Sequence, residues 1–315
     1  MFKGCYVALV TPFRNGQVDE SALGQLVEHV ITGGVDGVVP CGTTGESPTL
    51  TADEQRRVIE LVVKFTRGRV PVVAGTGTNS TASTLARSRA AAEAGADALM
   101  LVSPYYNRPN QRGLYEHFAA VARDTRLPIL LYNIPGRTGV EISNETLARL
   151  HVDFANITAV KHATGSVEGA AALAAVSGID ILSGDDPITL PLIAVGAVGV
   201  VSVLGNLLPG PMSAMTRAAL AKDWATAKQW HDRLFPLSRD LMKLDINPMP
   251  IKTALALRGM MAEEFRLPMC PMDAAGRAKL ETLLEDYADL IGTAATATAN
   301  ATETKPTRPK TPAVA

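Results

Sequence analysis

The stretch NITAVKHATGSVEGAAALAAV, residues 156–176, contains the repeating unit from which the fold is predicted. Its first part, residues 157–162, is a short run of apolar and β-branched residues, which is typical of a buried strand. A polar turn follows, and then an alanine-rich segment of helical period at residues 166–176. Lys161 stands where the strand should end, although lysine is among the residue types least often buried. Either its stem lies along the surface with the ammonium in solvent, or its amine takes part in chemistry.

The same order of strand, turn and helix recurs along the chain. Strands are predicted at residues 6–11, 37–42, 70–77, 98–104, 128–133, 157–162, 179–185 and 199–204. Helices between them are predicted at 51–65, 81–94, 112–124, 166–176 and 187–195, and the first of these opens with the capping box Thr51 to Glu54. Near-continuous apolar strands alternating with helices indicate parallel strands that are covered on both faces. Eight of them favour an α/β fold of the (β/α)8 TIM-barrel type over an open doubly wound sheet.

The domain organisation follows from the change of pattern after the eighth strand. The barrel is predicted to span residues 1–222, and a C-terminal helical region packed on it is predicted at 223–292. The segment 293–315 is rich in Thr, Ala and Pro and has almost no large apolar residue, so we expect a disordered tail.

Composition excludes several classes of protein. The chain has 315 residues, 47% of them hydrophobic and 19% charged, with a formal net charge of −1, so it has no basic excess for nucleic acid or an anionic membrane. Three widely spaced cysteines indicate neither a disulfide framework nor a zinc site. No apolar run approaches the roughly 18 residues of a membrane span, and the N-terminus resembles a first strand rather than a signal peptide. We therefore expect a cytoplasmic protein.

Polar side chains gather at the ends of the predicted strands. In a TIM barrel the carboxyl ends of the strands meet at one mouth, which is where chemistry takes place. The residues at these ends include Thr11, Thr43, Thr44, Asn79, Tyr105, Tyr106, Tyr132, Arg137, Lys161, Gly184, Asp185, Asp186 and Ser202. Each has a structural alternative: the threonines can cap a helix, the tyrosines can be interface aromatics and Arg137 can be a surface charge. The two aspartates lack a further set of ligands, so no metal is expected.

The chemical hypothesis for Lys161 has three physical requirements. The amine must be neutral to attack a carbonyl, and burial disfavours an ammonium whose ordinary pKa is about 10.4. Protons must move, and Tyr132 at the end of the preceding strand carries a phenol that Thr43 can link to another donor. An anion site must orient the substrate, and the hydroxyls and backbone N–H groups around Thr43 and Thr44 offer one.

Five motifs carry a resemblance to a known family. GTTGES at 42–47, PYYNRP at 104–109, LYNIPGRTG at 131–139, VKHATG at 160–165 and LSGDD at 182–186 closely resemble the 4-hydroxy-tetrahydrodipicolinate synthases. These belong to the pyruvate-dependent class I aldolase and N-acetylneuraminate lyase family. The resemblance runs from Met1 to about Leu290. It implies a lyase that uses no separate cofactor and condenses pyruvate with L-aspartate 4-semialdehyde in diaminopimelate and lysine biosynthesis.

The resemblance also implies a role for individual residues. Lys161 would form an imine with pyruvate, whose carboxylate would lie beside Thr44 and Thr43. Tyr132, Thr43 and Tyr106 would relay protons, with Tyr106 contributed across a dimer interface of a homotetramer. Arg137 would bind the carboxylate of the semialdehyde, a feature not shared by the sugar-acid aldolases and lyases of the wider family. The last two expected pocket residues are Gly184 and the main-chain carbonyl of Val201.

One departure concerns feedback by lysine. Relatives that lysine inhibits strongly carry a His and a Glu in an interface pocket, and the matching positions here are Gln55 and Ser83, while Asn79 and Tyr105 remain. We therefore expect weak or no inhibition by L-lysine.

Two other functions remain open for the protein: another pyruvate-lysine aldolase acting on a sugar-derived or hydroxy-keto acid, and a non-catalytic barrel that binds pyruvate-like acids.

Overall fold

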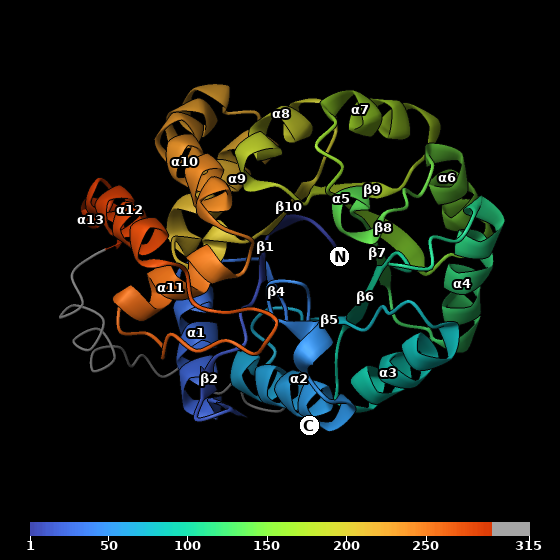
Figure 1. Ribbon diagram of the computed structural model, residues 1–315. Helices are drawn as coiled ribbons and strands as arrows, with labels where there is room; N and C mark the ends of the chain where they lie inside the picture. Colours follow the sequence, from blue (N-terminus) through green and yellow to red (C-terminus); the bar gives the residue numbers. More distant parts are fainter. Residues whose placement is uncertain (292–315) are drawn as a thin grey trace, which may run out of the picture.

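The computed structural model describes residues 1–291 and contains a barrel of eight parallel strands surrounded by helices (Figure 1). The barrel strands are β1 (Gly4–Ala8), β4 (Gly37–Val39), β5 (Val73–Gly75), β6 (Ala98–Val102), β7 (Ile129–Asn133), β8 (Ile157–His162), β9 (Asp180–Ser183) and β10 (Gly199–Ser202). They pair in the order β4-β1-β10-β9-β8-β7-β6-β5, and a parallel bridge between Val38 and Val72 joins the two ends. The TIM-barrel prediction is confirmed, and the open doubly wound sheet is wrong.

Most strands are shorter than predicted at their carboxyl ends. The predicted strand 157–162 matches β8, but the one predicted at 37–42 ends at Val39. Cys41 has a φ of +58°, which turns the chain out of the extended conformation. The polar residues that follow β4 therefore belong to a loop at the mouth.

Helices cover the outside of the barrel. They are α1 (Glu20–Thr32), α2 (Ala52–Thr66), α3 (Thr81–Glu93), α4 (Gln111–Asp124), α6 (Asn144–Asp153), α7 (Val167–Val176), α8 (Thr189–Ala194) and α9 (Pro209–Leu220). Short elements lie in the loops: the β2–β3 hairpin (Phe13–Arg14 and Gln17–Val18), α5 (Pro135–Thr138), and the 3-10 turns η1 (Ser47–Thr49), η2 (Asp186–Ile188) and η3 (Leu204–Asn206). The capping box predicted at Thr51 and Glu54 is present at the start of α2.

Two layers of apolar side chains result from the alternation along each strand. One layer fills the barrel and includes Tyr6, Met100, Tyr132, Ala159 and Leu182, while the other lies between strands and helices. Because side chains alternate between the two faces, a residue two places beyond an inward-facing one also faces inward. Lys161 stands in this relation to Ala159 and therefore points into the barrel.

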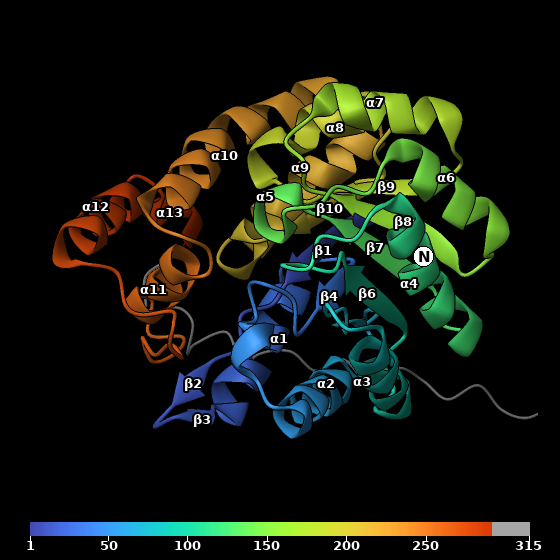
Figure 2. The same cartoon turned by 45° about the vertical axis from the view of Figure 1, so that its right-hand side comes forward.

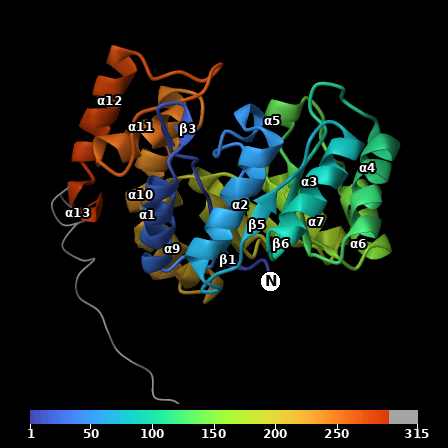
Figure 3. The ribbon, with the colours of Figure 1, turned by 90° about the horizontal axis from the view of Figure 1, so that it is seen from below.

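The chain after the barrel forms helices along one side of it (Figures 2 and 3). These are α10 (Trp224–Leu244), α11 (Met249–Leu257), α12 (Ala274–Glu285) and α13 (Ala288–Ile291). The domain boundary at residue 222 stays a prediction, although α9 ends at Leu220 and α10 begins at Trp224. The tail predicted at 293–315 lies outside the described residues. No helix within residues 1–291 is both long and apolar enough to cross a membrane.

Candidate active site

Lys161 and Tyr132 are neighbours inside the mouth of the barrel. They occupy paired positions on β8 and β7, and each is only 4% exposed. The Lys161 Nζ lies 4.1 Å from the centroid of the Tyr132 ring. The lysine is thus withdrawn from bulk solvent and does not extend along the outer surface. A buried amine beside a phenol can act as a nucleophile next to a proton donor.

The loop after β4 presents the two threonines. It is closed by backbone hydrogen bonds from Gly45 N to Gly42 O (3.2 Å) and from Glu46 N to Thr43 O (3.1 Å). Thr43 is half-buried, whereas Thr44 is 2% exposed. Neither caps α2, because Thr51 does so, and the helix-capping alternative for the two threonines is therefore wrong.

A residue outside the barrel links this loop to Arg137. The side-chain amide of Asn247 donates to Thr44 Oγ1 (3.0 Å), and its backbone carbonyl accepts from the exposed Arg137 guanidinium (3.0 Å). The Asn247 Oδ1 atom is buried and has no hydrogen-bond partner among the described residues. Sequence reasoning missed Asn247 because it lies far along the chain from both contacts. The two prolines at 248 and 250, which interrupt the helical pattern next to Asn247, were the only feature of the sequence that marked this segment.

Gly184 and Val201 belong to the two strands that follow β8 around the barrel, Gly184 directly after β9 and Val201 on β10. Gly184 N donates to His162 O (2.8 Å), and a Cβ added to Gly184 would lie 2.5 Å from the Cβ of Ala163, so no side chain fits there. Val201 is buried in the barrel and pairs with Tyr6.

The two aspartates after Gly184 have different surroundings. Burial raises the pKa of Asp185, and the nearby positive charge of Lys161 opposes this shift. Asp186 accepts backbone hydrogen bonds from Val203 N and Leu204 N, so it holds the chain after β10. Across residues 1–291, no group of three or more His, Cys, Asp or Glu side chains is placed to hold a metal ion.

Tyr106 does not enter the mouth of its own chain. It lies in the loop after β6 with a φ of +71° and is 91% exposed, whereas Lys161 is buried. Within the described part of the chain, no hydrogen bond joins the hydroxyls of Tyr132, Thr43 and Tyr106. The predicted relay is therefore not assembled by one subunit alone.

The four residues of the expected lysine pocket lie on neighbouring elements. Gln55 on α2 is buried, and its amide donates to Gly75 O (2.7 Å). Ser83 is exposed in the first turn of α3. The carbonyl of Asn79 accepts from the side chain of Asn107 (2.8 Å), which joins the loop after β5 to the one that carries the half-buried Tyr105. The Gln55 amide thus holds the barrel backbone, and among the four Ser83 is the exposed residue.

Comparison with known proteins places these observations in a family. The model of the dihydrodipicolinate synthetase family matches residues 1–287. The 4-hydroxy-tetrahydrodipicolinate synthase of Geobacter sulfurreducens is 50% identical over 289 residues, which cover 91% of this chain and 99% of that protein.

Solved structures agree. The 4-hydroxy-tetrahydrodipicolinate synthase of Methylacidiphilum fumariolicum SolV is 46% identical, with a TM-score of 0.90 over 95% of this chain and 99% of its own. A chloride-inhibited dihydrodipicolinate synthase from Acinetobacter baumannii, complexed with pyruvate, is 41% identical, with a TM-score of 0.89 over 92% and 100%. With the buried lysine at the mouth of the barrel, these similarities show that the chain belongs to the dihydrodipicolinate synthetase family.

Proposed function

We propose that the mouth of this barrel condenses pyruvate with L-aspartate 4-semialdehyde through a covalent imine at Lys161. The chain is a lyase whose product is 4-hydroxy-tetrahydrodipicolinate, formed in the first committed step of diaminopimelate and lysine biosynthesis. The single observation that carries the assignment of the nucleophile is the burial of Lys161 inside the barrel against the ring of Tyr132.

The reaction begins on pyruvate. The neutral amine of Lys161 attacks the keto carbon, and the oxygen leaves as water after protonation, which gives an iminium ion. Loss of a proton from the methyl group yields an enamine, because the iminium accepts the electron pair. The enamine carbon then attacks the aldehyde of the second substrate, whose oxygen takes up a proton.

Release of product restores the enzyme. The amino group of the second substrate attacks the iminium carbon, Lys161 leaves as the free amine, and the ring closes. Tyr132, Thr43 and Tyr106 carry the protons of these steps. No metal or separate cofactor is required, since the iminium itself stabilises the carbanion.

Two anion sites orient the substrates. Thr44 and Thr43 bind the carboxylate of pyruvate, and Gly184 with the carbonyl of Val201 bounds the pocket beside Lys161. Arg137 binds the carboxylate of the semialdehyde, a role supported by its position at the rim and its contact with Asn247. A guanidinium at this position favours the semialdehyde over the sugar-derived keto acids of the alternative function.

Association completes the site. Tyr106 is a large aromatic side chain left almost fully exposed, and its loop holds it in a left-handed conformation. We infer that it enters the mouth of a neighbouring subunit in a homotetramer built as a dimer of dimers. An isolated subunit would then lack one member of the relay, so activity depends on association. The site of action is the cytoplasm.

Borohydride trapping tests the proposed function. Pyruvate plus borohydride should add a pyruvate-derived carboxyethyl group to Lys161 and to no other lysine, as read by peptide mass spectrometry. The variant Arg137→Ala should keep this labelling but lose turnover of the semialdehyde. A protein that stays unlabelled would refute the imine, and full turnover by Arg137→Ala would favour the alternative aldolase.

A further inference from the structure

A second lysine is buried more deeply than Lys161 and has no part in the reaction described above. The side chain of Lys252 on α11 is 0% exposed, and its Nζ lies 2.5 Å from Oε1 of Glu46, itself 1% exposed. The same Nζ donates to Glu264 O (2.7 Å) and lies over the rings of Phe13 and Phe265, at 4.4 and 4.8 Å from their centroids. The ion pair is thus enclosed by aromatic rings and backbone.

Stability alone does not account for this pair. Desolvation of two buried charges commonly cancels their attraction, so well-packed apolar residues can replace such a pair without loss of stability. Consistent with this cost, burial lowers the pKa of Lys252, opposed by the charge of Glu46. Such a pair can instead hold the two segments that carry its charges in a single arrangement.

Glu46 is also held in a conformation that favours glycine. Its φ is +51° and its ψ is 36°, in the left-handed region that residues with a Cβ rarely adopt. A glycine, Gly45, is the preceding residue, yet it is Glu46 that adopts the left-handed backbone conformation. The turn therefore keeps a side chain where a glycine would be easier to accommodate, and that side chain contacts Lys252 with one oxygen and Arg266 N with the other (3.2 Å).

The turn held in this way is the one that carries both threonines. Glu46 N donates to Thr43 O, so a shift of Glu46 moves Thr43. At the other end of the pair, Lys252 N donates to Pro248 O, next to Asn247, which contacts Thr44 and Arg137. One buried contact thus connects the loop at the pyruvate carboxylate with the segment beside Arg137.

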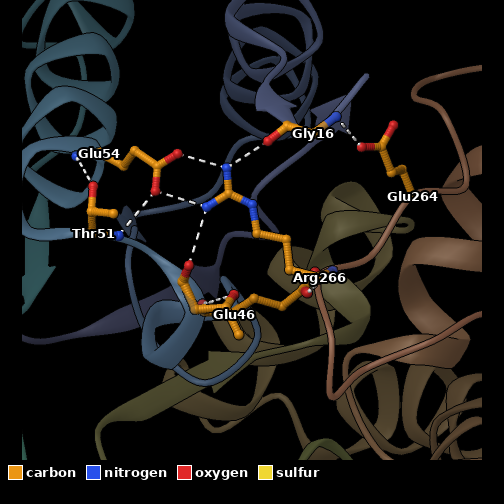
Figure 4. Close-up of polar contacts among 7 residues, drawn as sticks. Gly16, Glu46, Thr51, Glu54, Glu264 and Arg266 are labelled. Atoms are coloured by element: carbon orange, nitrogen blue, oxygen red, sulfur yellow. Dashed lines mark hydrogen bonds and ion pairs between the residues drawn. The ribbon is translucent and has the colours of Figure 1, made fainter.

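A second ion pair nearby, between Arg266 and Glu54, differs in that its carboxylate belongs to α2 and not to the turn. Arg266 donates through two nitrogens to the carboxylate of Glu54 and also to the carbonyl of Gly16 (Figure 4). Figure 4 also shows Glu264 directed at Gly16, where its carboxylate accepts from the backbone N–H groups of Asn15 and Gly16. The contacts of the Glu54 carboxylate and of Gly16 tie the same C-terminal segment to the start of α2 and to the hairpin. Arg266 reaches the turn itself through other groups, because its backbone N donates to Glu46 (3.2 Å) and its guanidinium donates to Thr49 O (3.1 Å), and Glu54→Gln leaves both of these donors and acceptors in place.

We propose that Glu46 and Lys252 are positioning residues, whose buried ion pair sets Thr43 and Thr44 in register with Asn247 and Arg137 so that both substrate carboxylates are bound in one geometry. This inference rests on the proposed function. Neither residue touches substrate; each acts through the backbone that it holds. Misplacement of a binding group by about 1 Å can reduce rates by up to about a hundredfold, so a small shift of this turn should be measurable in kinetics.

The test compares three variants with the wild-type protein. Lys252→Met keeps an unbranched chain but leaves the Glu46 charge buried alone, whereas the double variant Glu46→Gln with Lys252→Met removes both charges. The matched control is Glu54→Gln, which breaks the neighbouring ion pair of Arg266. For each we measure KM for pyruvate, KM for the semialdehyde, kcat, the pyruvate dependence of borohydride trapping at Lys161, and the midpoint of urea unfolding.

The double variant should unfold at a urea concentration close to that of the wild type, yet show about a tenfold rise in KM for both substrates and in the pyruvate needed for half-maximal trapping. The control should keep both KM values within about twofold. Wild-type KM values in the folded double variant would overturn the inference, because the pair would then serve only charge balance. If Lys252→Met does not fold, the KM values of the double variant still decide between a positioning role and charge balance alone. If the wild type itself is not trapped at Lys161, the proposed function fails instead.

Discussion

Replacement of Asn247 by alanine should weaken pyruvate binding more than binding of the semialdehyde. The substitution removes the amide that donates to Thr44 Oγ1 at 3.0 Å. It leaves the backbone carbonyl that accepts from Arg137. Thr44 is 2% exposed, so solvent cannot easily replace the lost donor, and its side chain becomes free to rotate away from the proposed position of the pyruvate carboxylate.

The size of the effect follows from the contact that is lost. A net hydrogen bond contributes about 0.5–1.5 kcal/mol. Since about 1.4 kcal/mol corresponds to a factor of ten, KM for pyruvate should rise about twofold to twelvefold. Asn247→Asp should bind pyruvate more weakly than Asn247→Ala, because a carboxylate next to Thr44 repels the carboxylate of the substrate.

The assay for Asn247 separates the two substrates. Half-maximal borohydride trapping as a function of pyruvate concentration reports the first substrate alone, and steady-state kinetics report both. A matched control is Asn144→Ala, which removes an amide that joins α6 to α7 through the Gly169 carbonyl and that has no hydrogen bond to Thr44 or Arg137. Unchanged trapping in Asn247→Ala, or an equal loss in Asn144→Ala, would refute the reasoning.

Three further predictions follow from other contacts. Tyr132→Phe removes the phenol beside Lys161 and should lower kcat about 10²-fold or more, as measured with saturating substrates; an unchanged kcat would exclude Tyr132 from the relay. Hydrogen bonds from Arg266 lower the pKa of Glu54 to about 2 from its ordinary 4.5, so its stabilising contribution is present above pH 4.5 and is lost as pH falls toward 2. The urea midpoints of wild type and Glu54→Gln should therefore converge over that range, and a constant difference would contradict the ion pair as its origin. L-Lysine should inhibit weakly because no carboxylate faces its ammonium at Ser83, and Ser83→Glu should strengthen inhibition in a dose–response assay. Half-inhibition of the wild type at micromolar lysine would contradict this prediction.

The fold was predictable because its signal repeats. Each strand is a short apolar run, and the capping box at Thr51 marks the start of α2 as the structure has it. The strand ends were less certain, since Cys41 leaves the extended region in a way that residue type does not reveal. Two helices, α1 and α6, were not indicated, although their N-cap residues Asp19 and Ser143 could have identified them.

The candidate site was predictable only where it comes from the strand ends. Lys161 and Tyr132 are placed together by the barrel itself, because the ends of neighbouring parallel strands must meet. The role of Tyr106 cannot be judged from one subunit. Its side chain is exposed, which fits the proposal that it enters the mouth of a neighbouring subunit, and only an assembled oligomer can test this. Asn247 and Lys252 could not be predicted, because Thr44 and Glu46, which they contact, lie 203 and 206 positions earlier in the chain and no local pattern encodes such a contact.

The C-terminal region contacts the candidate active site and does not only pack on the outside of the barrel. Thr44 and Arg137 both belong to the barrel, but within the described residues Asn247 is the residue that contacts both of them. The turn that carries Thr43 is held by Lys252, again from outside the barrel. An isolated barrel of residues 1–222 would keep Lys161 and Tyr132, yet it would lose the contacts that Asn247 and Lys252 make at the two proposed carboxylate sites. Since orientation supplies much of the rate of such a reaction, we expect the isolated barrel to keep the proposed nucleophile but to turn over substrate far more slowly than the whole chain.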